Sequence, residues 1–172
     1  RRSSIVRANT DQGNHRATVH TRRGRSVEIE TTHERGGTGE SSHGFHRVTL
    51  TLTRADDAED ARVGVSGIKA HFGLTRESVR EWMCLEELPR GASFDETTQA
   101  TRVGFDETTR SVEILVPEYV APASLDFVLY DENTETYDEP SDGWGGSSFS
   151  VPIGFGNGHA RELGVTTSRF DE

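Results

Sequence analysis

Apolar residues and threonines alternate strictly in one segment of this chain, and this pattern constrains the fold more than any other feature. Residues 48–53 read Val-Thr-Leu-Thr-Leu-Thr. A period of two places the apolar side chains on one face of a β-strand and the threonines on the other. Similar apolar runs follow at 68–72, 111–116 and 125–130, and turn-forming residues separate them. The chain is therefore expected to fold as a set of short strands.

Short strands separated by turns are typical of an antiparallel sandwich. We predict an all-β fold, an immunoglobulin-like antiparallel β-sandwich, over residues 46–153. The run 125–130 is the most apolar and is expected at the centre of a sheet. Pro152 marks the run 149–153 as an edge strand, because proline cannot donate a ladder hydrogen bond.

Residues 1–45 and 154–172 are expected to lie outside the sandwich. The first segment has few apolar positions and a glycine-rich run at 36–39, and only Val27 and Ile29 alternate as a short strand would. Such a segment buries too little apolar surface to order itself. We predict a basic arm, disordered or held by a partner, and a short C-terminal tail.

The charge of the chain restricts its partners. The net charge is −10, yet residues 1–47 carry nine arginines and five acidic residues. This indicates a basic arm on an acidic body and argues against non-specific nucleic-acid binding. We expect protein partners, if any, to bind the arm. No window approaches the roughly 20 apolar residues of a membrane-spanning helix, so we expect no membrane insertion.

The residues present do not favour catalysis. The sequence has no Gly-x-Ser-x-Gly elbow, phosphate loop or His-Glu-x-x-His motif. Five of the seven histidines lie among residues 15–46, without a compelling ligand spacing. Cys84, the single cysteine, lies in an apolar run at 82–85 and is expected to be a buried, inert thiol. We predict no catalytic residue, metal or cofactor.

One short sequence occurs twice. Phe-Asp-Glu-Thr-Thr at 94–98 returns at 105–109. Two copies are too few for a repeat architecture. We expect two similar loops with Phe94 and Phe105 tucked beneath them.

The first eight residues resemble the end of a transit peptide. They are rich in arginine and serine and contain no acidic residue. The step Val6-Arg7-Ala8 is similar to the processing site of chloroplast precursors. A plastid location is therefore expected, with an ordinary disordered terminus as the alternative.

Two aromatic residues stand in a polar, glycine-rich segment. Trp144 follows Gly143, and Tyr137 precedes it by seven residues. Flat aromatic faces suit stacking on a sugar ring, whose axial C–H groups form an apolar surface. The alternative is that Trp144 folds back over the edge of a sheet.

A series of motifs follows in order from residue 71 to residue 153. These are His71-Phe72-Gly73, Trp82, Leu88-Pro89, Thr101-Arg102-Val103-Gly104-Phe105, Val112–Val116, Ala121-Pro122, Asp126-Phe127-Val128-Leu129, Tyr137, Gly145-Gly146 and Phe149-Ser150-Val151-Pro152-Ile153. The ordered set resembles the starch-binding modules found in tandem at the N-terminus of plastid α-glucan water dikinases. In that family a tryptophan stands at the position of Phe72 and often at that of Tyr137.

The resemblance implies a non-catalytic module that binds an α-glucan such as starch or another polysaccharide. Aromatic side chains would stack on glucose rings, and polar side chains would bond to sugar hydroxyls. The implied stacking residues are Phe72, Trp82, Tyr137 and Trp144, and the implied polar residues are Lys69, Asp131 and Asn133.

A sandwich does not determine a function, so alternatives remain. A structural or linker subunit of a large plastid assembly, such as a photosynthetic antenna or photosystem complex, would use the sandwich as a docking block. A fragment of a larger enzyme such as a glucan dikinase is a third alternative. Nothing in the chain resembles the dikinase catalytic regions.

Overall fold

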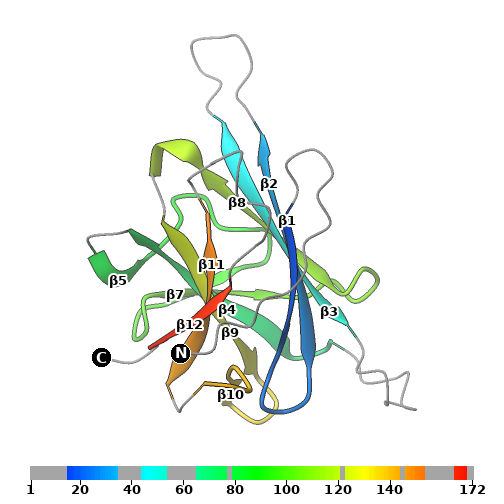
Figure 1. Cartoon of the computed structure of the whole chain (residues 1–172). Helices are drawn as coiled ribbons and strands as arrows, with labels where there is room; N and C mark the ends of the chain where they lie inside the picture. Colours follow the sequence, from blue (N-terminus) through cyan, green and yellow to red (C-terminus); the bar gives the residue numbers. More distant parts are fainter. Residues whose placement is uncertain are drawn as a thin grey trace.

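Two antiparallel β-sheets contain the named strands of the described residues (Figure 1). The computed structural model describes residues 15–34, 44–53, 65–76, 79–120, 123–143, 146–153 and 165–169. The predicted all-β sandwich is confirmed. No helix among these residues has the length and apolar character needed to cross a membrane.

The first sheet has the strand order β1-β2-β3-β8. Its strands are β1 (His15–His20), β2 (Ser26–Glu34), β3 (Phe45–Thr53) and β8 (Ser111–Pro117). The alternating segment 48–53 lies in β3, with Val48, Leu50 and Leu52 buried. Its threonines face outward and are half-buried.

Residues 15–34 belong to this sheet, and the expectation that they form an arm outside the sandwich is wrong. β2 pairs with β3 along its whole length, from Ser26 opposite Thr53 to Glu34 opposite Phe45. Each strand of the β1–β2 hairpin contributes only a few core side chains, Ala17 and Val19 from β1 and Val27 and Ile29 from β2. These side chains are buried because the hairpin pairs with β3. The composition of the segment does not reveal this pairing. Residues 1–14 lie outside the described part of the chain.

The second sheet has the main strand order β12-β11-β9-β4-β7-β6, while β10 pairs with β9 and β5 pairs with β4. Its strands are β4 (Ile68–Arg76), β5 (Val79–Met83), β6 (Ser93–Asp95), β7 (Ala100–Gly104), β9 (Ser124–Asp131), β10 (Thr136–Asp138), β11 (Ser147–Pro152) and β12 (Thr166–Arg169). A short 3-10 helix, η1 (Glu118–Val120), follows β8. The central position predicted for 125–130 is confirmed in β9.

Two expectations about the end of the chain are wrong. β11 is not an edge strand, because β12 pairs with its residues 147–150. Pro152 lies past this pairing, so its missing N–H interrupts no ladder with β12. β12 also shows that the segment 154–172 contributes a strand to the sandwich and is more than a tail.

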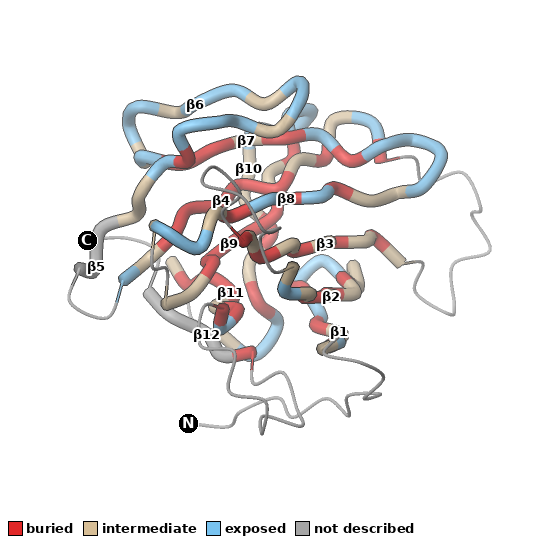
Figure 2. The backbone as a smooth tube through the Cα atoms, turned by 90° about the horizontal axis from the view of Figure 1, so that it is seen from above, coloured by how far each residue is buried: buried red, intermediate tan, exposed pale blue. Residues whose placement is uncertain are grey.

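A single core cluster takes side chains from both sheets. Buried residues follow the middle of the molecule and exposed residues follow the outer turns, as the tube in Figure 2 shows. Ile29, Leu50 and Ile114 enter the core from the first sheet. Phe72 and Phe127 enter it from the second.

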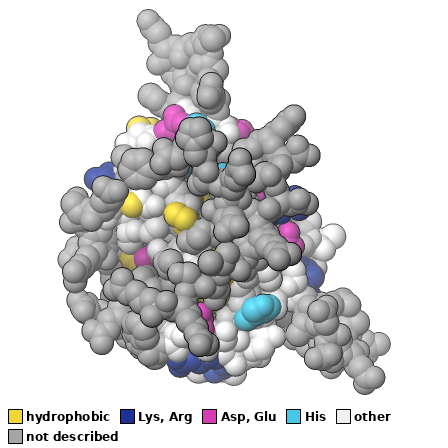
Figure 3. Space-filling model, viewed as in Figure 1, with side chains coloured by type: hydrophobic (Ala, Val, Ile, Leu, Met, Phe, Trp, Pro, Cys, Tyr) yellow, Lys and Arg dark blue, Asp and Glu magenta, His cyan; other side chains and the backbone are white. Residues whose placement is uncertain are grey.

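A buried carboxylate joins the β1–β2 turn to the second sheet. Asp138 in β10 accepts hydrogen bonds from Thr21 Oγ1 at 2.7 Å and from the Arg23 amide at 3.0 Å. Arg25 Nη1 lies 2.8 Å from the same carboxylate. Ion pairs therefore connect Arg25 of the basic N-terminal segment to the acidic body. Among the described side chains that show in Figure 3, both basic and acidic groups occur.

Candidate functional site

Strand β4 has one face in the core and one face outward. Ile68, Ala70, Phe72 and Leu74 are buried in the core cluster, so Lys69, His71 and Gly73 face the other side of the sheet. The register places Lys69 opposite Tyr130 of β9 and His71 opposite Arg102 of β7. The outward face of this sheet thus collects polar and aromatic side chains.

We call the resulting group the aromatic face, which consists of His71, Trp82, Arg102, Tyr130 and Tyr137. The rings of Tyr130 and Tyr137 have centroids 5.2 Å apart. The imidazole of His71 lies 5.1 Å from the Tyr137 ring and 5.8 Å from the Trp82 ring. His71 is buried, whereas Trp82, Tyr130 and Tyr137 remain half-buried at the surface. Three aromatic rings thus stand around a covered histidine.

Arg102 connects the members of the aromatic face. Its guanidinium carbon lies 3.9 Å from the centroid of the Tyr130 ring, within the range of a cation–π contact. Its Nη2 donates to Tyr137 Oη at 3.1 Å, and its Nε donates to His71 Nδ1 at 2.9 Å. These bonds hold one cation between the rings and orient Tyr137.

His71 is kept neutral by its surroundings. Because Nδ1 accepts from Arg102, the ring proton stands on Nε2, which donates to Thr98 Oγ1 at 3.2 Å. Thr98 in turn donates to Asp95 Oδ2 at 2.5 Å. Burial, followed by the charge of Arg102, lowers the pKa of His71 to about 4. The neutral imidazole lies beneath the rings and connects Arg102 to Thr98 through its two ring nitrogens.

The two copies of Phe-Asp-Glu-Thr-Thr form similar loops, as expected. In both, the residue after the second threonine has a left-handed backbone, with φ 56° at Gln99 and 57° at Arg110. Asp106 of the second copy accepts from the amides of Thr108 and Thr109. Only the first copy reaches the aromatic face, through Asp95 and Thr98.

The two phenylalanines of these loops differ in burial. Phe105 is buried as predicted, whereas Phe94 is exposed. The expectation that Phe94 tucks beneath its loop is therefore wrong.

Three of the predicted binding residues lie on this side of the sheet. Trp82 and Tyr137 belong to the aromatic face, and Lys69 lies beside Tyr130 with its Nζ 2.6 Å from Glu132 Oε1. Phe72 does not lie there: its side chain is 1% exposed and packs in the core. The assignment of Phe72 as a stacking residue is wrong, because the alternation of β4 turns it inward.

Asp131 and Asn133 hold the turn between β9 and β10. Asp131 accepts from the Asn133 amide at 2.9 Å and lies 3.6 Å from Arg25 Nη2. Asn133 Nδ2 donates to the Ser66 carbonyl at 3.3 Å. The structure thus gives both side chains a role in the turn. Trp144 lies outside the described residues.

Cys84 departs from its prediction. β5 ends at Met83, so Cys84 follows the strand and is exposed. Its Sγ donates to the carbonyl of Leu85 at 3.2 Å. The expectation of a buried thiol rests on a strand at 82–85, whereas the observed strand begins three residues earlier and ends two residues earlier.

Sequence reasoning missed His71, Arg102 and Tyr130 as members of the site. The strict alternation of β4 was a usable signal for His71, since Phe72 and His71 must face opposite sides of a strand. No local signal pointed to Arg102 or Tyr130, which meet His71 only through the pairing of β7 and β9 with β4.

The aromatic face offers a definite chemistry. Half-buried rings present flat apolar surfaces, and Arg102 and Lys69 supply N–H donors beside them. A ligand with alternating C–H faces and hydroxyl groups complements both features. Comparison of the chain with family models, with curated proteins and with solved structures finds no match.

Proposed function

We propose that this protein is a non-catalytic carbohydrate-binding module whose ligand is an α-glucan such as starch. One observation carries the proposal: Trp82, Tyr130 and Tyr137 stand half-exposed on one sheet face beside two cationic side chains. The cations are Arg102, which is bonded to Tyr137, and Lys69, which neighbours Tyr130.

Sugar binding on such a face has a simple physical basis. The C–H groups of a glucose ring pack on an aromatic ring, and its hydroxyls accept hydrogen bonds from guanidinium and ammonium groups. The bonds from Arg102 to His71 and Tyr137 fix the donor and one ring before any ligand arrives, which reduces the ordering cost of binding. Each binding event is nevertheless expected to be weak, because few groups take part.

The identity of the sugar and the cellular location come from sequence. The α-glucan is suggested by the resemblance to plastid starch-binding modules, and the plastid by residues 1–8. Both remain predictions. Within the proposal the protein carries no catalytic role, and an origin as part of a larger enzyme stays open.

The decisive experiment is sedimentation of the full chain with insoluble starch, with cellulose and chitin as parallel supports. Retention on starch that soluble maltoheptaose releases would support the proposal. Equal retention on all three supports would indicate a carbohydrate module without α-glucan preference. Failure of the protein to bind starch, amylose and maltoheptaose would overturn the proposed function.

A second candidate function, a docking block in a larger plastid assembly, is favoured by a different surface. A cleft of about 620 Å³ lies between β8, η1 and residues 85–90. Its lining includes the exposed apolar side chains of Leu88, Leu115 and Tyr119. Glu86, Glu87, Glu113 and Arg90 also line it, so acidic side chains outnumber the basic one. An apolar segment of a partner protein that carries basic side chains would complement this cleft.

This alternative has its own test. A peptide of alternating leucine and lysine is titrated against the protein and compared with a peptide of equal charge in which serine replaces leucine. Docking predicts that only the leucine peptide binds and that Leu115→Glu weakens it. Equal binding of the two peptides would reduce the effect to net charge and reject the alternative.

A further inference from the structure

Two histidines meet a glutamate at one end of the first sheet. His33 of β2 and His46 of β3 are direct partners in the antiparallel register. Their rings stack with centroids 4.8 Å apart and an interplanar angle of 25°. Glu118 of η1 contacts His33 Nε2 through its carboxylate. One donor atom from each of the three residues lies within 4.8 Å of the other two.

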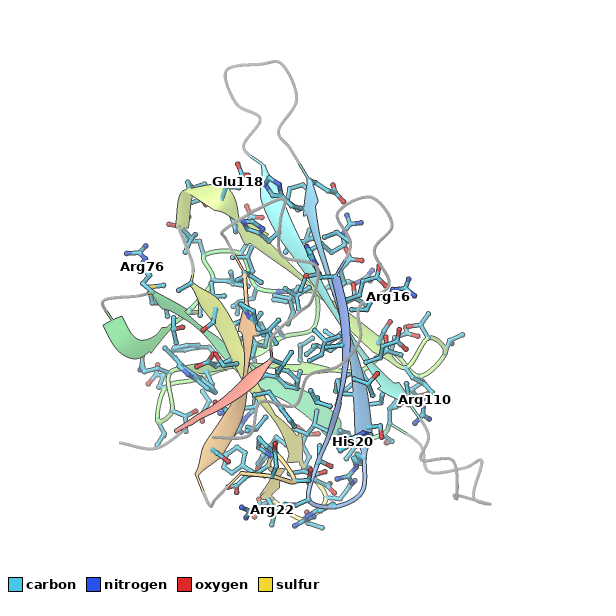
Figure 4. The ribbon with its side chains drawn as sticks, viewed as in Figure 1. Arg16, His20, Arg22, Arg76, Arg110 and Glu118 are labelled. Carbon is cyan, nitrogen blue, oxygen red and sulfur yellow. The ribbon has the colours of Figure 1, made fainter. Side chains whose placement is uncertain are left out.

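The backbone around this cluster leaves room for the carboxylate. The Glu118 amide donates to the Gly44 carbonyl at 2.9 Å, which ties η1 to the start of β3. A Cβ on Gly44 would stand 2.5 Å from Glu118 Oε2. A side chain at position 44 would therefore push Glu118 away from the two histidines. Figure 4 shows Glu118 at the end of the molecule where β2 ends and β3 begins.

We propose that His33, His46 and Glu118 form a binding site for a divalent transition-metal ion, with Zn²⁺ as the best match. Two imidazole nitrogens and one carboxylate oxygen are a donor set that Zn²⁺ favours, with bonds of about 2.0–2.2 Å. Tetrahedral bonds of that length place donor atoms about 3.4 Å apart. The observed limit of 4.8 Å therefore requires donor atoms to approach one another by up to about 1.4 Å.

The three ligands differ in exposure. His46 is buried at 7% exposure, whereas His33 and Glu118 are exposed. Because the site is open on the side of His33 and Glu118, a water molecule is the expected fourth ligand.

A bound ion would add a link between β2, β3 and η1, which already meet through the β2–β3 pairing and the bond from the Glu118 amide to Gly44. The site is separate from the aromatic face, since none of its residues belongs to that group. The inference therefore does not depend on the proposed sugar binding.

The test uses the full chain, stripped with a chelator and titrated with Zn²⁺ by calorimetry. One equivalent is expected to bind, and the melting temperature is expected to rise with Zn²⁺ concentration. His33→Gln and Glu118→Gln are each expected to weaken binding at least about tenfold, since even outer-shell changes cost about 10–100-fold. The control is His20→Gln, an exposed histidine that Figure 4 places far from Glu118.

Nitrogen chemical shifts of the histidine rings provide a readout that a structural ion pair would not produce. Zn²⁺ is expected to shift the ring nitrogens of His33 and His46 and to leave those of His20 and His71 unchanged. Circular dichroism and melting of the metal-free variants establish that they fold. Absence of Zn²⁺ binding, or equal loss in the His20→Gln control, would overturn the site and leave a plain His–Glu ion pair.

Discussion

The indole of Trp82 lies directly on Gly73, and a Cβ at position 73 would stand 2.5 Å from the Trp82 side chain. β5 pairs with β4 next to this point, with Met83 opposite Leu74. The absence of a side chain on Gly73 therefore sets the height of the indole above the sheet. This contact explains why glycine follows His71 and Phe72 in the motif, and it supplies the first prediction.

Gly73→Ala is expected to displace Trp82 and to lower stability by about 1–3 kcal/mol, the usual cost of overpacking. Near-ultraviolet circular dichroism and the melting temperature measure the two effects. Gly104→Ala is the matched control, because a Cβ there meets nothing within 4 Å. Equal behaviour of the two variants would show that the indole is not seated on Gly73.

His71 is expected to make stability fall in mild acid. Its pKa is lowered from 6.5 to about 4 in the folded chain, first by burial and then by Arg102. Between these two pH values His71 is protonated in the unfolded chain but stays neutral in the folded chain. The free energy of unfolding is therefore unaffected by His71 above about pH 6.5. It falls progressively as the pH drops to about 4, by up to about 3 kcal/mol.

Urea unfolding of the wild type and of His71→Gln across pH 4–7 checks this prediction. Glutamine offers both an acceptor and a donor, so the variant is expected to fold with a smaller pH dependence in this window. His20→Gln controls for the loss of an exposed histidine. Identical slopes for the wild type and His71→Gln would contradict the assignment.

Asp138 is expected to be the most costly carboxylate to replace among those described here. Asp138→Asn removes the ion pair with Arg25 and weakens the bonds from Thr21 and the Arg23 amide. Removing one partner of a buried ion pair lowers the free energy of unfolding by about 3–5 kcal/mol. Because Arg25 is partly exposed, we expect a loss of about 3 kcal/mol for Asp138→Asn. Denaturant unfolding measures the loss.

The comparison variant for Asp138 is Glu30→Gln. Glu30 pairs with Arg16 at 3.0 Å on the surface, and such pairs contribute less than about 1 kcal/mol. Both variants change a carboxylate to an amide on or beside the β1–β2 hairpin. A loss at Asp138 no larger than that at Glu30 would mean that the hairpin is not tied to β10.

Tyr137→Ala is expected to weaken the affinity for starch about tenfold. Truncating a stacking aromatic costs about 1.4 kcal/mol of binding free energy, which corresponds to that factor. Tyr137→Phe keeps the ring and loses the bond from Arg102, so it is expected to retain most of the binding. Tyr119→Ala is the control, since Tyr119 is exposed and lies in the cleft beside η1. Trp82→Ala is expected to reduce both retention and melting temperature. Unchanged retention in Tyr137→Ala would remove the aromatic face from the binding site.

Several strands were predictable from local patterns in the sequence. β3 and β8 alternate apolar and polar residues, so the pattern alone determines which face is buried. β9 is a continuous apolar run at 125–130 and is buried on both faces. The same rule applied to β4 would have placed Phe72 in the core and His71 outside.

The β1–β2 hairpin could not be predicted in the same way. Each strand has only a few core residues among polar neighbours, and its burial comes from the pairing of Val27 with Leu52 and of Ile29 with Leu50. The composition shows the low apolar content of the hairpin, but it does not show that β3 pairs with the hairpin and helps to bury its apolar side chains. Only the tertiary structure decided that residues 15–34 belong to the sandwich.

The sequence by itself therefore determined the strand-rich character of the chain and the inward side chains of its clearest strands, because a period of two is a local property. The tertiary structure decided which distant residues meet. Arg102 reaches His71 across 31 positions, and Glu118 reaches His33 across 85. Such contacts depend on sheet register and on chain crossings, which are set by the packing of the whole core.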